Sequence, residues 1–454
     1  MRLSHYTLCY SLNKLTVLFH TISGRVAIIP SSPSLHASNP GNGFVSGFDT
    51  TGLPESTAKE LTRAGFLTSK TLSEEKSLLS AYAEKLNSLN TANDKKIGYL
   101  GLLLSYSCND TCANCFQRSA KTDRAAKLSE KDVERIISSL NNLFPGVDSR
   151  DITVVLYGGE PFMPGNMETI RKILAISAAT GFRIEALTNG LNISAYGEHF
   201  GPACGRVSAI QVSAHFPEAT QADISTRFGL ISPGIAKVLS AKCRVNLRLN
   251  LFPNEPHLIP GLDKTLQASV WAEEELFTAY LAPIQSHHAL SRISGYYKDW
   301  IAFNRKWGKK KTFQHKLIES LILKEGRLRP FKTAFCMTHK PNSFIIDPEL
   351  NIYNCFADVG HPEHSIGAFN PLGWTFAKSG AKRKGTIFNS VCLGCQIALF
   401  CGGSCSSHVL DECTGACDVS GCQLKKQTFE ATLAAAIEDN RDIISKLSMG
   451  DGPG

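Results

Sequence analysis

The feature that most constrains this chain is a group of three cysteines within eight residues, Cys108-Asn-Asp-Thr-Cys112-Ala-Asn-Cys115. The group follows an apolar run, Leu100 to Leu104, which predicts a buried strand. Barrels and α/β sheets build their sites at the ends of such strands. Three thiols on one loop can ligate three irons of a four-iron cluster and leave the fourth iron open. The alternative is a structural zinc loop, but closed zinc sites usually take a second pair of ligands from elsewhere.

The cysteine content also bears on the cellular compartment. The chain has 15 cysteines among 454 residues. Its N-terminal residues alternate apolar and polar side chains without the unbroken apolar core of a signal peptide, and no stretch reaches transmembrane length. We therefore expect a cytoplasmic protein, whose thiols stay reduced and free to bind metal.

The charge balance says little about partners. The formal net charge is +8, but part of the excess lies in one run, Lys306 to Lys311, which predicts a solvated face. Nucleic-acid binding would require basic residues interleaved with aromatic ones, or a known module. The sequence has neither, so neither nucleic acid nor a membrane is expected as a partner.

Residues 1–96 are expected to form a small N-terminal module. Two apolar runs, Leu15 to His20 and Arg25 to Pro30, are joined by Ser23-Gly24 and predict a hairpin. Strands followed by short helices suit a winged-helix-like module. The other expected elements are a loop from Pro30 to Gly43 and helices from Ser56 to Ala64 and from Ser73 to Leu89.

Residues 97–300 alternate short apolar runs with helical stretches, which is the rhythm of a parallel α/β sheet or barrel. Six strands are fewer than the eight of a closed barrel, so we expect a partial (β/α)6 barrel. Residues 301–335 are expected to bridge to a cysteine-rich domain, 336–447, with a final amphipathic helix from Gln423. The expected strands are Leu100 to Leu104, Thr153 to Tyr157, Arg183 to Thr188, Ala209 to Ser213, Arg244 to Leu251 and Leu276 to Leu281, and the clearest helices are Ser129 to Leu143, with Ser129 as N-cap, and Met167 to Thr180.

At Cys108, Cys112 and Cys115, with the aromatic Phe116 after the third, the chain resembles the radical S-adenosylmethionine (SAM) superfamily. The resemblance implies that these cysteines hold a [4Fe-4S] cluster whose open iron binds SAM. One electron passed to SAM would then give a 5′-deoxyadenosyl radical.

Further matches to this superfamily follow in order along the chain. Gly158-Gly159-Glu160-Pro161 would meet the SAM amino group, since glycines allow close approach and a carboxylate suits an ammonium; a plain glycine turn is the alternative. Asn189 and Ser213, at the ends of the next two strands, would line the SAM pocket. Arg227 would hold the SAM carboxylate or lie on the surface. The chain departs from relatives at Ala214-His215-Phe216-Pro217, and further candidates are Asp223 and Asn250.

The second cysteine set, Cys392-x2-Cys395-x5-Cys401-x3-Cys405, resembles the central motif of the SPASM extension found in radical SAM enzymes that modify peptides and proteins. The resemblance implies two auxiliary [4Fe-4S] clusters, the second with an open iron or a non-cysteine ligand. A zinc-binding interaction module is the non-enzymatic alternative. The implied ligands are Cys392, Cys395, Cys401 and Cys422 for one cluster, and Cys336, Cys355 and Cys405 for the other.

Several cysteines lie outside these assignments. Cys413 and Cys417 could supply the missing ligand, approach a substrate or remain free thiols. Cys9, Cys204 and Cys243 are expected to pack as small hydrophobic residues. In the segment before Cys355, Leu350 replaces a glycine that relatives often carry, so we expect a different turn there.

The resemblance implies oxidative modification, expected to be a crosslink, of a ribosomally synthesised precursor peptide or protein, with an electron donor such as flavodoxin or ferredoxin. Formylglycine formation in sulfatases is the alternative. Enzymes of that kind carry an aspartate base directly after the second auxiliary cysteine, where this chain has Phe356, with Asp358 beyond it. The N-terminal module, with its Ala64-Gly65-Phe66-Leu67 turn, resembles leader-binding domains that pair a strand with a peptide; a structural cap is the alternative.

Overall fold

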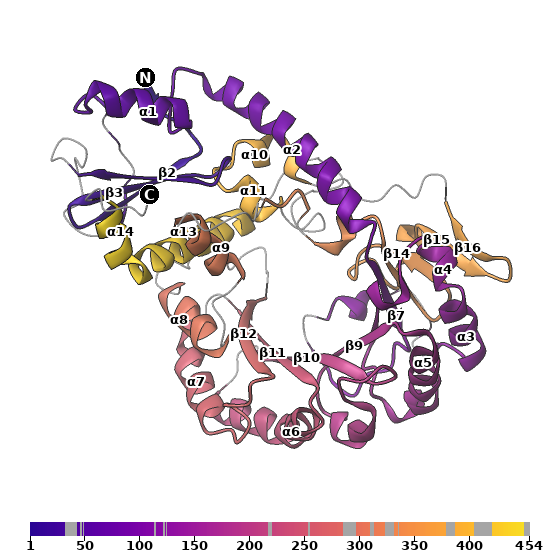
Figure 1. The fold of residues 1–454 in the computed structure, drawn as a ribbon. Helices are drawn as coiled ribbons and strands as arrows, with labels where there is room; N and C mark the ends of the chain where they lie inside the picture. Colours follow the sequence, from indigo (N-terminus) through magenta and orange to yellow (C-terminus); the bar gives the residue numbers. More distant parts are fainter. Residues whose placement is uncertain are drawn as a thin grey trace. The chain divides into compact units, whose positions relative to one another are not determined.

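The computed structural model (Figure 1) describes residues 1–31, 43–45, 48, 50–112, 115–120, 123, 125–216, 220–252, 255–284, 297–308, 313–322, 331–334, 336–377, 386–403 and 420–448. The chain forms two compact units, each of which is discontinuous in sequence. The first comprises residues 1–89, 310–335 and 385–454, and the second comprises residues 90–309 and 336–384. Cys405, Cys413 and Cys417 lie outside the described residues, as does most of the predicted loop before Gly43.

The second unit is built on a ten-stranded mixed sheet. Six neighbouring strands, β7 to β12, are parallel and follow one another across the sheet in sequence order. Each overlaps one of the six predicted apolar runs, so the α/β prediction is confirmed, while closure into a partial barrel stays a prediction. Their bounds are β7 Gly98–Leu103, β8 Ile152–Tyr157, β9 Arg183–Thr188, β10 Val207–His215, β11 Arg244–Leu251 and β12 Phe277–Pro283.

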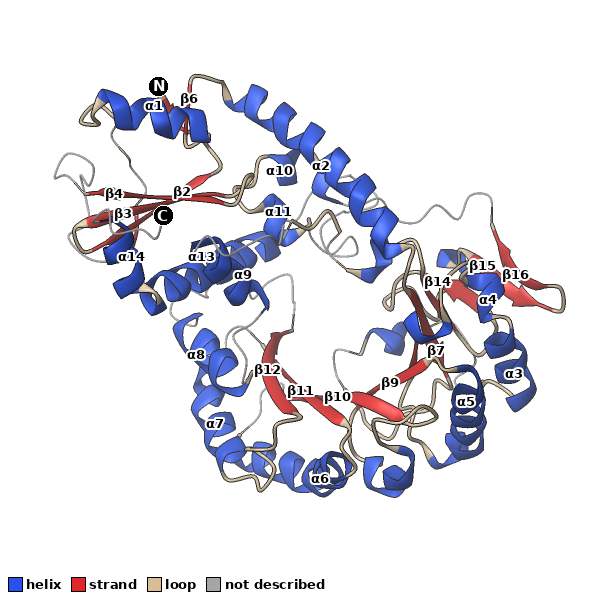
Figure 2. Cartoon of the chain, viewed as in Figure 1, coloured by secondary structure: helices blue, strands red, loops and turns tan. Residues whose placement is uncertain are grey.

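Helices line one side of this parallel sheet (Figures 1 and 2). Ser129 is the N-cap, as predicted, and its side chain accepts a hydrogen bond from the Asp132 amide. The prediction of one unbroken helix to Leu143 is wrong, because Ser139 leaves the helical conformation and separates α3 from α4. The helices are α3 Glu130–Ser138, α4 Leu140–Leu143, α5 Met167–Thr180, α6 Gln221–Ser240, α7 Ile259–Gln267 and α8 Tyr297–Trp307.

Four more strands extend the sheet beyond β7. β13 (Ser343–Ile346) pairs in parallel with β7, and β14 (Asn351–Tyr353), β15 (Gly367–Asn370) and β16 (Gly373–Phe376) follow in antiparallel order. In the turn between β13 and β14, Leu350 has a φ of +66°. Leu350 therefore adopts the left-handed backbone for which glycine is the usual residue.

The buried carboxylate of Asp347 holds this turn together. It accepts hydrogen bonds from the amides of Glu349 (3.1 Å) and Asn351 (2.9 Å). It also accepts from the hydroxyls of Tyr106 (2.9 Å) and Tyr353 (3.1 Å). Asp347 thus links the loop after β7 to the strand that precedes Cys355.

The first unit contains a four-stranded antiparallel sheet of order β4-β3-β2-β5. The predicted hairpin is confirmed: β3 (Leu15–His20) pairs with β4 (Arg25–Pro30) around Gly24, whose φ is +68°. The strand β2 (Thr7–Leu12) was not predicted. Both predicted helices are present, α1 as Glu55–Ala64 and α2 as the longer Leu72–Asp94, and the remaining strands are β1 Arg2–Leu3, β5 Gly43–Phe44 and β6 Leu67–Thr68.

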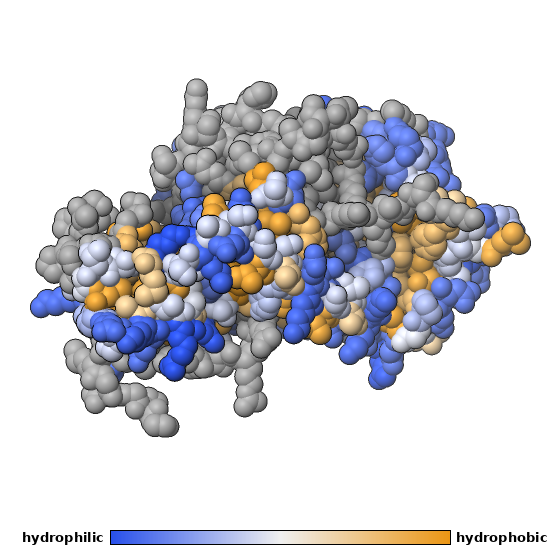
Figure 3. All heavy atoms as spheres, turned by 90° about the horizontal axis from the view of Figure 1, so that it is seen from above, coloured by the Kyte–Doolittle hydropathy of each residue, from blue (hydrophilic) through white to orange (hydrophobic). Residues whose placement is uncertain are grey.

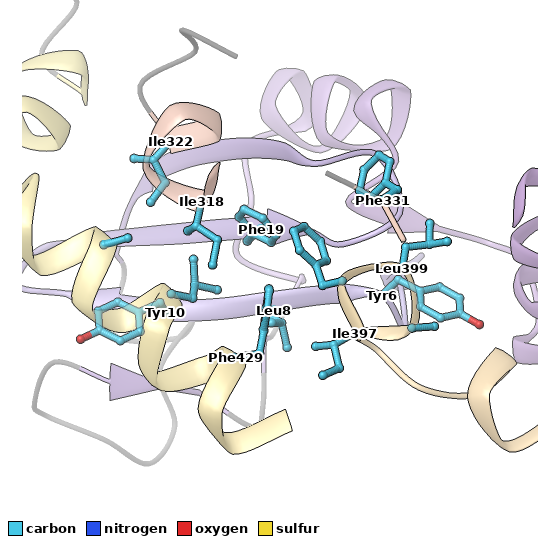
Figure 4. Packing of buried hydrophobic residues seen from close by; sticks show 14 of the residues in the cluster. Tyr6, Leu8, Tyr10, Phe19, Ile318, Ile322, Phe331, Ile397, Leu399 and Phe429 are labelled. Atoms are coloured by element: carbon cyan, nitrogen blue, oxygen red, sulfur yellow. The ribbon is translucent and has the colours of Figure 1, made fainter. Parts of the chain in front are cut away.

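One core joins this sheet to helices from distant parts of the chain (Figure 4). The ring of Phe19 lies 5.7 Å from that of Phe400 and 6.2 Å from that of Phe429, and the latter two rings are 4.7 Å apart. Ile318 and Ile322 complete the contact. The helices involved are α9 Phe313–Ile322, α10 Ser390–Leu393, α11 Ala398–Cys401, α13 Ser420–Asp439 and α14 Arg441–Ser448.

The predicted terminal helix is interrupted. Asn440 separates α13 from α14, and its side-chain amide donates hydrogen bonds to the carbonyl of Ala436 (2.8 Å) and to Glu319 (3.1 Å). A single continuous helix was therefore a wrong prediction, because this tertiary contact leaves no trace in local periodicity.

None of the helices in the described ranges is long and apolar enough to cross a membrane. On the face shown in Figure 3, hydrophilic and hydrophobic residues are interspersed over the described part of the surface.

Replacement of Phe429 by Ala should lower the free energy of unfolding by about 3–5 kcal/mol, because it removes a fully buried ring from the shared core. Phe388, which is 36% exposed, offers a matched control. The same replacement there should cost about 1 kcal/mol or less. Thermal unfolding of both variants measures the difference, and equal losses would contradict the placement of Phe429.

The stability of the first unit should depend on pH through His20. Burial lowers the pKa of His20 from 6.5 to about 4. Between these values the unfolded chain binds a proton that the folded chain does not, so stability falls as the pH falls, by about 3 kcal/mol. The Gln side chain in His20→Gln does not titrate, so its stability lacks this pH dependence. The free energy of unfolding of the wild type should therefore fall relative to that of His20→Gln as the pH is lowered from 7. A difference that does not change with pH would exclude this effect.

Candidate metal centre

The ends of three neighbouring parallel strands meet at the first cysteine loop. Cys108 lies shortly after β7, Gly158 directly follows β8, and Asn189 directly follows β9. Because β7, β8 and β9 are adjacent and parallel, their carboxyl ends lie at the same edge of the sheet. Cys108 and Cys115 are exposed and Cys112 is partly exposed, so the loop presents its thiols to a ligand.

The three thiols of this loop influence one another electrostatically. Burial, followed by the charges of Asp110 and the other two cysteines, raises the pKa of Cys112 to about 12, although Arg227 opposes the shift. Burial likewise raises the pKa of Cys108. A hydrogen bond from the backbone of Asp110 opposes the shift, and the charges of Glu160, Asp110 and Cys115 add to it. Thiolates gathered in this way are stabilised by a metal centre, which keeps its ligands deprotonated. The donor set therefore fits an iron–sulfur cluster.

The two glycines before Glu160 let the loop after β8 lie directly against the cysteine loop. The amides of Gly159 and Glu160 donate to the carbonyls of Ser105 and Ser107, both at 2.9 Å. A Cβ atom on Gly159 would lie 2.2 Å from the Ser107 oxygen. The close approach predicted from these glycines is thus present, and its partner within the chain is the backbone that leads into Cys108.

Glu160 is completely buried and ties the ends of β8 and β9 together. Its carboxylate accepts hydrogen bonds from the Thr188 hydroxyl (2.7 Å), the Asn189 amide (2.7 Å) and the Phe162 amide (3.0 Å). Burial raises the pKa of Glu160, while these hydrogen bonds oppose the shift. The carboxylate predicted to meet SAM therefore also fixes the position of Asn189.

Asn166 secures the chain on the other side of Glu160. Its side-chain amide donates to the carbonyl of Pro161 (3.1 Å) and to the hydroxyl of Ser105 (3.2 Å). Pro161 itself is buried.

Phe116, the aromatic residue after the third cysteine, begins a short 3-10 helix, Phe116–Ser119, directly after Cys115.

Arg227 lies at the cysteine loop and not on the surface. It donates to Asp110 at 2.7 Å and to the carbonyl of Asn189 at 3.3 Å. Asn189 in turn donates to Asn109 at 2.8 Å. By contrast, the carboxylate of Asp223 caps α6 by accepting from the Thr220 amide and hydroxyl, away from this network.

A row of polar residues lies on β10, β11 and β12. Only Ser213 and Asn250 of this row were predicted from the sequence as site residues. Register places Gln211 beside Asn246, Ser213 beside Arg248, and His215 beside Asn250. The hydroxyl of Tyr280 donates to Gln211 at 3.0 Å, and Asn250 lies 3.3 Å from the ring of His215. The signal was available, because polar residues occupy every second position of these strands. The members of this row are Gln211, Ser213, His215, Asn246, Arg248, Asn250, Thr278 and Tyr280.

Four cysteines predicted to hold one auxiliary cluster all belong to the first unit. Cys392 lies in α10, Cys401 ends α11, and Cys422 lies in α13. The Cys395 amide donates to the Cys392 carbonyl at 2.9 Å. Burial raises the pKa of Cys401 to about 11, and the charges of Cys395 and Cys422 contribute. The structure thus brings these cysteines into one region.

Cys336 and Cys355 belong to the second unit. Cys355 is buried after β14, and the ring of the next residue, Phe356, packs edge-on against Tyr157 at 4.6 Å. Across the described ranges, no three His, Cys, Asp or Glu side chains converge closely enough to hold a single metal ion. A single zinc ion needs ligand atoms about 2.3 Å away on all sides.

A comparison with known protein families gives a match in the region of this site. Residues 98–194, which contain Cys108, Glu160 and Asn189, match the model of the 4Fe-4S single cluster domain. No curated protein sequence matches the chain.

Several solved structures are similar to this chain. The chain is similar to "Native anSMEcpe with bound AdoMet", with a TM-score of 0.52 and 13% identity, over 76% of this chain and 99% of that one. The same protein "with bound AdoMet and Cp18Cys peptide" gives a TM-score of 0.51 at 13% identity, with the same coverage of 76% and 99%. Streptococcus suis SuiB bound to precursor peptide SuiA gives 0.47 at 15% identity, over 93% and 99%. The matched domain contains the predicted cysteine loop, and the anSMEcpe structures share the fold of this chain.

Gly159→Ala should lower the free energy of unfolding by about 3 kcal/mol or more, because the added Cβ forces apart two loops joined by backbone hydrogen bonds. Gly165 provides the control, since nothing lies within 4 Å of a Cβ there. Gly165→Ala should change stability by less than about 1 kcal/mol. Thermal unfolding compares the two, and a tolerated Gly159→Ala would refute the close approach.

A double-mutant cycle of Asp110→Asn and Arg227→Gln should show coupling of about 1 kcal/mol or more in the free energy of unfolding, because the ion pair is largely buried, with exposed side-chain fractions of 21% and 15%. Chemical denaturation of the four proteins gives the coupling. Additive effects would show that the pair does not form.

Proposed function

We propose that the chain is a radical SAM enzyme. The observation that carries this proposal is the loop of Cys108, Cys112 and Cys115 at the ends of parallel strands, in a fold shared with an AdoMet-bound protein. When bound, a four-iron cluster and SAM would supply a 5′-deoxyadenosyl radical that abstracts hydrogen, and auxiliary clusters would accept the electron released as a crosslink closes. An external donor such as flavodoxin or ferredoxin would supply the electron that cleaves SAM.

The residues of the chain would hold and orient these groups. Cys108, Cys112 and Cys115 would bind the cluster and leave one iron open. Glu160 keeps Asn189 beside the cysteine loop through a 2.7 Å hydrogen bond. Arg227, whose guanidinium lies beside Asp110, would hold a carboxylate such as that of SAM. Gly158, Gly159, Pro161, Phe116 and Ser213 would complete the SAM pocket.

The proposed substrate is a ribosomally synthesised peptide. The seven cysteines of the SPASM-like pattern support this class, and Cys405 would join Cys336 and Cys355 as a ligand. An anSMEcpe structure of the same fold contains a bound Cp18Cys peptide. We assign residues 1–96 to leader binding, 97–300 to the radical SAM core and 336–447 to the auxiliary clusters.

One observation keeps formylglycine formation as a second candidate. Asp358 is buried, and its carboxylate lies 3.4 Å from the ring of His364, a pairing that suits a general base. Against this, the position directly after Cys355 is filled by Phe356, whose ring is packed on Tyr157. We therefore favour peptide crosslinking.

Replacing Cys108, Cys112 and Cys115 together by Ala should reduce 5′-deoxyadenosine production under dithionite to the level without enzyme, because the cluster loses all its thiolates. Liquid chromatography of the reaction mixture measures the product. Cys204→Ala should leave the rate unchanged, because Cys204 lies outside both sets. Cys204 is exposed, so the expectation that it packs as a small hydrophobic residue is wrong, whereas Cys9 and Cys243 are buried as expected. Wild-type rates in the triple variant would refute the assignment.

Anaerobic reconstitution should give about twelve irons per chain if three four-iron clusters form. Iron and acid-labile sulfide assays measure this number. A value near four would exclude the auxiliary clusters, and colourless protein containing zinc would favour the interaction module.

A further inference from the structure

The loop between Cys392 and Cys395 is hydrogen-bonded to the N-terminal segment of the chain. The hydroxyl of Tyr6 donates to the carbonyl of Leu393, and the ring of His5 donates to the carbonyl of Gly394 at 2.8 Å. These two carbonyls belong to the residues between the two cysteines. The backbone that sets the spacing of the two thiols is therefore held from residues almost four hundred positions earlier.

Two more hydrogen bonds fix the residue after Cys395. The hydroxyl of Thr21 donates to the carbonyl of Gln396, and the side chain of Gln396 donates to the carbonyl of His5 at 2.9 Å. The backbone amide of Thr21 also donates to the carbonyl of Tyr6 at 2.8 Å. This hydrogen bond connects the residue that contacts Leu393 with the residue that contacts Gln396. Tyr6 and Thr21 are buried, with exposed fractions of 1% and 2%.

The N-terminal segment is itself anchored by Glu75 of α2. The carboxylate of Glu75 accepts from the Ser4 hydroxyl at 2.5 Å, from Arg2 at 2.6 Å and from the His5 amide at 3.3 Å. On the same helix, Lys76 lies close to Gly394, since a Cβ on that glycine would be 3.1 Å from the lysine Cε. The segment is thus rigid enough to position another loop.

Packing continues the contact past Cys395 to Cys401. Figure 4 shows Tyr6 and the strand residues Leu8 and Phe19 in the same core as Ile397 and Leu399. The helix α11, which ends at Cys401, therefore packs in the same core as the N-terminal sheet.

We propose that the turns flanking strands β2 and β3 are a positioning element of the auxiliary metal site, with Tyr6, His5 and Thr21 fixing the Cys392–Cys395 loop. This inference rests on the proposed assignment of Cys392, Cys395, Cys401 and Cys422 as cluster ligands. It gives residues 1–96 a task in holding metal in addition to the leader binding proposed above. These three side chains act through the backbone of the loop and do not touch the metal.

Tyr6→Phe tests the proposal, and the chain offers a close control. Tyr10 lies four residues later in the same core and also donates a single side-chain hydrogen bond, but to Glu438 at 3.0 Å. Both replacements remove one buried hydroxyl. Only Tyr6→Phe frees the Cys392–Cys395 loop.

The measurement is the rate at which a chelator removes iron from the reconstituted full-length protein. Iron should leave the different clusters in separate kinetic phases. The phase of the auxiliary site is identified as the one that is missing when Cys392 and Cys395 are both replaced by Ala. Tyr6→Phe should accelerate that phase about fivefold, the factor that one hydrogen bond of ordinary strength supplies. Tyr10→Phe should leave it unchanged. Equal rates in the two variants, whether fast or slow, would overturn the proposal.

A second pair of variants covers the case in which Tyr6→Phe does not fold. Thr21→Val removes the bond to Gln396, whereas Thr7→Val removes a similar bond to Phe66 at 3.3 Å. Hydrogen exchange of the Cys395 amide should speed up in Thr21→Val alone. Failure of the cluster assignment would appear separately, as a wild-type protein that lacks the kinetic phase altogether.

Discussion

The buried carboxylate of Glu160 is the interaction on which the candidate centre depends. It receives three hydrogen bonds and has no exposed surface, so it is satisfied by the ends of β8 and β9. A buried carboxylate that loses these donors would carry a large desolvation cost. The same loop donates its Gly159 and Glu160 amides to the backbone leading into Cys108. The position of the first thiol is thus set by neighbouring strand ends as well as by its own loop.

The second constraint is that each unit is assembled from distant segments. Cys336 and Cys355 belong to the unit that carries the parallel sheet, whereas Cys392 and Cys422 belong to the unit built on the N-terminal sheet. The cysteine-rich C-terminal segment is therefore divided between two cores. One set depends on Asp347 and the β13–β14 turn, and the other on the buried face of the N-terminal sheet. Metal binding at Cys392, Cys395, Cys401 and Cys422 would stabilise the unit built on the N-terminal sheet.

Much of this arrangement could be read from local sequence. Apolar residues located the six strands β7 to β12. β7 and β8 are buried on both faces and are nearly continuously apolar, whereas β10 and β11 alternate apolar with polar residues. The two glycines before Glu160 revealed a close approach, although their neighbour within the chain could not be known. Local patterns could not show that Asn440 breaks the last helix, since its partner Glu319 lies far away in sequence. The polar row through Gln211 and Arg248 was visible as alternation, but only strand pairing places its members side by side.

In the proposed enzyme, Cys108, Cys112 and Cys115 build a four-iron site with one iron open to SAM. Electron paramagnetic resonance of the reduced protein, recorded with and without SAM, tests this site most directly. We expect an iron–sulfur signal that changes when SAM is added, and we expect this change to disappear when the three cysteines are replaced. A reduced protein whose iron–sulfur signal is absent, or is unaffected by SAM, would contradict this proposal.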